Sequence, residues 1–231
     1  MSLKDKRDLV IEKKAKLDNI INSEEKYELI KEITILLKDI YNTTGLYKDK
    51  IELIEIYFIK SSFEKNYEVL DDPIQNAFNT LRKAKRLVDE LFLHNHNIVE
   101  RKLVIECYYD YIKLGNKLKI KKINKNVFKL LYNSWFIYNS TKLVDDLKNI
   151  IRTYLLIADV KFDAKKYLIS RYFYKKAFKK MGVLYEEFKY EGMREDIVVI
   201  VKCLLNTYKN KNNKGYLKWT NILKEYGGNY E

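Results

Sequence analysis

Few residues in this sequence have the types and spacing that enzymes use. The chain has two histidines, His94 and His96, and residues two apart in a helix lie on different faces. Neither has cysteine ligands nearby, so a polar turn explains the pair better than a metal site. The sequence also lacks the glycine-rich phosphate loop, the Gly-x-Ser-x-Gly motif and the His-Glu-x-x-His motif. We therefore predict a non-enzymatic protein with no catalytic residues, no metal and no cofactor.

Basic and aromatic residues are the more informative groups. Lys and Arg number 45 against 32 Asp and Glu, which gives a formal net charge of +13. Such a charge favours nucleic acid, phosphate or anionic surfaces as partners. The heavy use of Lys, Asn, Ile and Tyr throughout the chain is an alternative, purely compositional explanation. Aromatic clusters such as Tyr108-Tyr109-Asp110-Tyr111 can stack on bases, but inside amphipathic helices they more often fill the core.

Two lysines, Lys60 and Lys65, lie five residues apart in a predicted helix. Inward-pointing lysines would indicate an anion site, because a buried charge must be paired. Outward-pointing lysines would indicate only a solvated helix face. The spacing by itself favours the solvated face.

The elements that must position these residues are helices. One proline and seven glycines are too few for the many turns of a sheet protein. Apolar residues recur at helical spacing, which predicts an all-α protein of about nine antiparallel helices in a bundle or solenoid-like array. Ser23 and the Asp72-Pro73 pair are helix-start signals, and Gly45 is a helix-stop signal. The first helix is predicted over about residues 4–21 and the sixth over about residues 123–138.

The last part of the chain differs in composition. We predict a single all-α domain over residues 1–209, followed by a basic linker and a short extra C-terminal helix within residues 210–231. Tyr216, Trp219, Ile222 and Leu223 share one face of that helix. A helix this short is marginal in water, so it must pack on something. The alternatives are the outside of the eighth and ninth helices, or the binding groove described below.

Cys107 and Cys203 lie in apolar helical patterns rather than in a disulfide framework. A reducing compartment is therefore expected, the cytoplasm first and the nucleus as the alternative. No run of about 18 apolar residues occurs, so we expect no membrane span.

Three local strings and the order of the helices resemble the 14-3-3 family. The first string is Asp8-Leu9-Val10 followed by Lys14-Ala15-Lys16-Leu17, which is similar to the opening helix of that family. The others are Tyr108-Tyr109-Asp110-Tyr111 and Phe173-Tyr174-Lys175-Lys176-Ala177-Phe178. The resemblance extends from about Lys4 to Lys209.

The resemblance implies a nine-helix protomer that forms a homodimer through its N-terminal helices. It also implies a concave groove that binds phosphoserine or phosphothreonine segments of client proteins. Proteins of that family are signalling adaptors. The implied function is therefore phosphopeptide binding, with protein clients as partners.

Carried over position by position, the phosphopeptide site falls on a small set of residues. Its basic positions fall close to Lys60 and Lys65, and its tyrosine falls on Tyr111. Its first asparagine falls near Ile151 or Arg152, and its second near Leu204, with Asn206 two residues on. A family arginine falls on Asp110, which reverses the charge and would repel phosphate. The resemblance thus predicts weakened or altered phosphate specificity. The alternative is a basic helical scaffold that binds nucleic acid or acidic protein partners.

Overall fold

A computed structural model of the chain describes residues 1–94, 96–188, 193–208, 211 and 213–228. These residues form ten α-helices and one short 3-10 helix, and no strand occurs among them. The prediction of an all-α protein with an extra C-terminal helix is confirmed.

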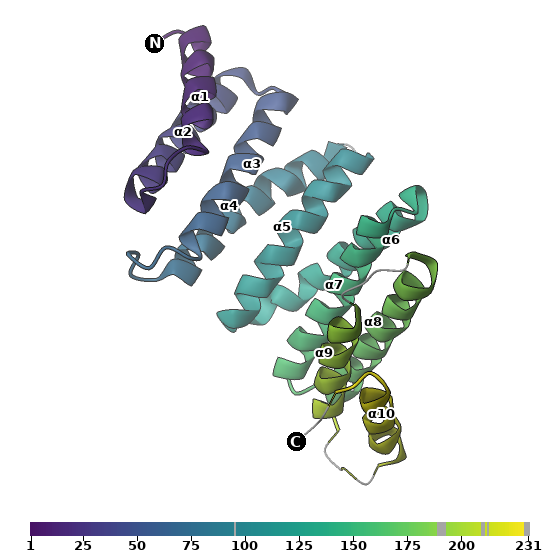
Figure 1. The fold of residues 1–231 in the computed structure, drawn as a ribbon. Coiled ribbons are helices and arrows are strands. Elements are labelled where there is room, and N and C mark those ends of the chain that lie inside the picture. The colour runs from purple at the N-terminus through teal and green to yellow at the C-terminus, as the bar shows by residue number, and fades with distance from the viewer. Residues whose placement is uncertain (95, 189–192, 209–210, 212, 229–231) are drawn as a thin grey trace. The chain divides into compact units, whose positions relative to one another are not determined.

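The chain divides into two compact units, residues 1–120 and 121–231. The helices of the first unit, in chain order in Figure 1, are α1 (Leu3–Leu17), α2 (Ser23–Thr44), α3 (Tyr47–Glu64), α4 (Pro73–His94) and α5 (Ile98–Lys117). The second unit contains the 3-10 helix η1 (Lys121–Asn126) and the helices α6 (Val127–Thr141), α7 (Val144–Asp163), α8 (Tyr167–Phe188), α9 (Met193–Asn206) and α10 (Lys214–Glu225). Within each unit, every helix packs on its neighbours in sequence, as expected for helices joined by short turns.

Two predicted boundaries differ from the structure. The first helix ends at Leu17 rather than near residue 21. The second helix begins at Ser23 as predicted, and Asn22 caps it, because the Asn22 side chain accepts bonds from the amides of Glu24 and Glu25. The predicted sixth helix divides into η1 and α6 at Asn126. Apolar periodicity continues through such short breaks, so it could not locate them.

The same hydrogen-bonded corner joins α2 to α3 and α6 to α7. In the first corner, the Thr44 hydroxyl donates to the buried Asp49 carboxylate and accepts from the Leu46 amide. In the second, Thr141 makes the equivalent bonds with Asp146 and Leu143. The residue after each threonine has a left-handed backbone conformation: Gly45 has a φ of 61° and Lys142 a φ of 53°. Each corner thus fixes how one helix follows the next.

The C-terminal helix α10 belongs to the core of the second unit. Tyr216, Trp219 and Leu223 are buried with side chains of α7, α8 and α9, and the Trp219 ring meets the Phe178 ring edge-on at 5.0 Å between centroids. Of the two alternatives for this helix, packing on α8 and α9 is therefore the one observed. Residues 209, 210 and 212 of the predicted linker lie outside the described residues.

Both cysteines are free, and Cys107 is buried. None of the helices in the described part of the chain is long and apolar enough to cross a membrane.

Candidate ligand-binding sites

The six residues of the predicted phosphopeptide site are divided between the two units. Lys60, Lys65, Asp110 and Tyr111 belong to the first unit, and Arg152 and Asn206 belong to the second. Each set is described within its own unit.

Lys60 is committed to a buried carboxylate of its own helix. Its Nζ lies 3.8 Å from Oε1 of Glu64, whose side chain is only 5% exposed. Tyr27 of α2 and Thr80 of α4 both donate hydrogen bonds to the same carboxylate, at 3.2 and 2.6 Å. Burial lowers the pKa of Lys60, and the negative charge of Glu64 opposes part of that shift. The role of Lys60 is therefore structural, because it is the ion-pair partner of the buried Glu64.

Lys65 and Tyr111 also have local roles. Lys65 is the C-cap residue that follows α3, and its amide donates to the Ser61 carbonyl. The Tyr111 ring stacks on Phe78 of α4 at 4.7 Å between centroids. Within the described part of the first unit, no hydrogen bond, ion pair or ring contact links Lys60 or Lys65 to Tyr111.

Asp110 lies in acidic surroundings. Desolvation raises the pKa of the neighbouring Glu106, and the charges of Asp110 on α5 and Glu55 on α3 raise it further, although part of the Glu106 side chain is exposed. Glu106 lies one helical turn before Asp110, so this part of α5 carries negative charge that does not favour a phosphate. The charge reversal noted at Asp110 is thus reinforced by its neighbours.

Arg152 lines an amphipathic groove formed by α7, α8 and α9. The groove has a volume of about 240 Å³, and its apolar lining is Ile151, Leu155, Met181, Leu184, Val199 and Ile200. Val199 is 58% exposed. Ile151, Met181, Leu184 and Ile200 are themselves buried, so the apolar contact that the groove offers comes from Val199 and the partly buried Leu155.

Charges of opposite sign flank this groove, which we call the α7–α9 groove. Lys148 and Arg152 stand on the α7 side and Asp196 on the α9 side. Lys148 forms a 3.4 Å ion pair with Asp145, whereas neither Arg152 nor Asp196 has an ion-pair partner among the described residues. The Arg152 guanidinium is therefore available to a ligand.

Asn206 is the last residue of α9 and is exposed. It is absent from the lining of the α7–α9 groove. Its position places it beside Thr207, which belongs to a second pocket of the same unit.

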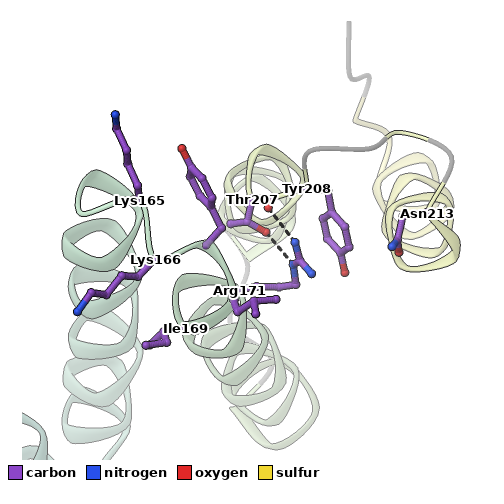
Figure 2. Close-up of a pocket in the computed structure, with 9 residues that line it drawn as sticks. Lys165, Lys166, Ile169, Arg171, Thr207, Tyr208 and Asn213 are labelled. Carbon is purple, nitrogen blue, oxygen red and sulfur yellow. Dashed lines mark hydrogen bonds between the residues drawn. The ribbon is translucent and has the colours of Figure 1, made fainter.

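This second pocket, which we call the α8-start pocket, opens at the turn between α7 and α8 (Figure 2). Its volume is about 560 Å³, and it is lined by Lys165, Lys166, Tyr167, Leu168, Ile169, Arg171, Thr207, Tyr208 and Asn213. In Figure 2, Lys165 and Lys166 lie on one side, and Arg171, Tyr208 and Asn213 lie on the other. The lining thus contains three cationic side chains and no carboxylate.

Arg171 is held firmly in this pocket. Its Nε donates to Oγ1 of Thr207 at 3.0 Å and one terminal nitrogen donates to the Thr207 carbonyl at 2.8 Å. Its guanidinium carbon also lies 3.6 Å from the centroid of the Tyr208 ring. These contacts cap the end of α9 and fix the plane of the guanidinium.

Sequence reasoning missed the α8-start pocket. The Lys165-Lys166 pair was visible, but Arg171 and Thr207 are 36 residues apart, and no local spacing predicts that they meet. Among the described residues, no group of three or more His, Cys, Asp or Glu could hold a metal ion.

In comparisons with known proteins, no family model and no curated protein matches this chain.

Proposed function

We propose that this protein is a non-enzymatic adaptor that binds a segment of a client protein in the α7–α9 groove. The observation that carries the proposal is the unpaired Arg152 beside an apolar surface that includes the exposed Val199. Apolar side chains of a segment would bind the apolar surface, and an anionic group on the segment would bind Arg152. The proposal agrees with the adaptor role implied by the resemblance to 14-3-3 proteins.

The preferred anionic group is phosphoserine or phosphothreonine, held differently from the predicted clamp. Lys60 already partners Glu64, and Asp110 has carboxylates as neighbours. Arg152 would supply the phosphate contacts instead. Asp196 on the opposite side would repel the phosphate and so orient the segment.

The test compares a phosphoserine- and phosphothreonine-containing peptide library with its dephosphorylated copy, using the full chain. We expect selective retention of phosphorylated peptides, and a loss of about tenfold or more in affinity for Arg152→Ala, because charge-assisted hydrogen bonds are lost. Arg82→Ala is the matched control, since Arg82 is an exposed arginine of α4. Equal retention of both libraries would reject phosphate recognition, and unchanged binding by Arg152→Ala would reject the groove.

The alternative is a basic scaffold that binds nucleic acid, which the net charge of +13 favours. Affinity for RNA or DNA of any sequence, falling steeply with salt, would support this alternative. Binding in the groove would be less salt-sensitive, because apolar contacts contribute to it.

A further inference from the structure

The α8-start pocket contains donors that the fold does not use. A guanidinium has five N–H groups, and Arg171 uses one from Nε and one from a terminal nitrogen to bind Thr207. The remaining N–H groups have no acceptor among the described residues. Because Thr207 and Tyr208 already hold the guanidinium in place, an anion that binds there meets a pre-organised fork.

The three cations that line this pocket have no carboxylate beside them in the lining. Neither Lys165 nor Lys166 has an ion-pair partner in the part of the chain that the structure describes. Burial lowers the pKa of nearby Lys161, and repulsion from Lys166 lowers it further. By contrast, lysines such as Lys85, which pairs with Asp89 at 2.7 Å, have acidic partners. Uncompensated cations around one pocket favour an anionic ligand.

The rest of the lining favours an apolar body attached to that anion. Leu168 is 76% exposed and Ile169 is 44% exposed, and Tyr167 adds an aromatic ring beside them. The pocket volume of about 560 Å³ lies in the range of small-molecule sites and is much larger than an inorganic phosphate requires.

We propose that the α8-start pocket is a second binding site, which takes an organic phosphate monoester with an aromatic or apolar body. The phosphate binds the free N–H groups of Arg171. Lys165 and Lys166 line the other side of the pocket and add positive charge to it, with side chains that extend away from Arg171 in Figure 2. The body contacts Tyr167, Leu168 and Ile169. The site is separate from the α7–α9 groove and does not depend on the function proposed for it.

The left-handed backbone at Lys165 allows a substitution that removes a charge without straining the fold. Lys165 has a left-handed φ of 57°, so Lys165→Gly removes a charge and relieves backbone strain. Lys119→Gly is its matched control, because Lys119 occupies the same kind of helix-ending turn in the other unit with φ 56°. Arg171→Ala is less suitable, since it also removes the cap of α9.

The experiment titrates phenyl phosphate into the isotope-labelled full chain and follows backbone amide signals by NMR. We expect the largest shifts at residues 165–171 and at Thr207 and Tyr208. Inorganic phosphate lacks the aromatic ring and benzyl alcohol lacks the phosphate, so each should bind more weakly than phenyl phosphate. The double variant Lys165→Gly/Lys166→Gln should bind phenyl phosphate more weakly, because positive charge is removed from the pocket, while Lys119→Gly binds like the parent.

Several outcomes would overturn the proposal. These are an absence of shifts at residues 165–171, equal affinity for phenyl phosphate and benzyl alcohol, and unchanged affinity in a folded double variant. Equally tight binding of phenylacetate would overturn the preference for phosphate. Loss of binding in Arg152→Ala alone would place the ligand in the α7–α9 groove instead.

Discussion

At the scale of single residues, the cations of this protein have distinct roles that their sequence positions do not reveal. Lys60 partners a buried carboxylate, Arg171 caps a helix while keeping donors free, and Arg152 has no ion-pair partner among the described residues. Only charges that the fold leaves unsatisfied are available to a ligand, because a paired charge would first have to lose its partner. The surroundings of each cation, more than the total charge, therefore indicate where anions bind.

The Tyr27–Glu64 bond predicts a specific response to alkaline pH. Burial raises the pKa of Tyr27 to about 12, and the negative charge of Glu64 adds to that shift. A group whose pKa is higher in the folded state stabilises the fold below its unfolded pKa, and this contribution is lost as pH rises through the folded pKa. Between about pH 10 and pH 12, thermal unfolding should therefore show the parent losing more stability than Tyr27→Phe. Parallel losses in the two proteins would contradict this prediction.

At the scale of elements, α10 is an integral part of the second unit. Its three buried side chains lie in the core with those of α7, α8 and α9, while Leu217 on its other face is 52% exposed. This segregation explains why so short a helix is ordered, since its stability comes from packing rather than from propensity.

Trp219→Ala should destabilise the protein by about 3–5 kcal/mol, because it removes a large buried side chain and leaves a cavity. Leu217→Ala, on the exposed face of the same helix, should change stability by no more than about 0.5 kcal/mol. Urea unfolding followed by circular dichroism measures both effects. A loss below about 1 kcal/mol for Trp219→Ala would show that α10 contributes little to the core.

At the scale of the whole molecule, the resemblance to 14-3-3 proteins predicts that two copies of the chain form a homodimer. Dimerisation through the N-terminal helices requires an apolar surface on α1. Ile11 is 68% exposed on that helix, and Leu3 is 38% exposed. These residues are the ones that a partner copy would cover.

We predict that the parent sediments as a dimer at micromolar concentration and that Ile11→Glu sediments as a monomer, because a charge would be buried without a partner. Leu93→Glu is the control, since Leu93 is 77% exposed at the end of α4. A monomeric parent, or equal effects of the two substitutions, would reject an interface centred on α1.

The sequence by itself determined the fold class and much of the helix order. Scarce breakers and helical apolar spacing required helices, and Pro73 begins α4 as the Asp72-Pro73 signal predicts. The apolar face of the last helix also predicted its burial, because Tyr216, Trp219 and Leu223 repeat at helical spacing. Signals of this kind act within a few residues of the chain, so they can be read without the fold.

Only the tertiary structure decided which charged groups are satisfied and which are free. Glu64 receives bonds from Tyr27, 37 residues away, and from Thr80, 16 residues away, and this is what assigns Lys60 its structural role. Arg171 likewise gains its fixed orientation from Thr207 and Tyr208 at the end of another helix. The energy of a charge depends on its distance from partners and on its removal from water. Both quantities are set by packing between distant segments, which no local pattern in the sequence records.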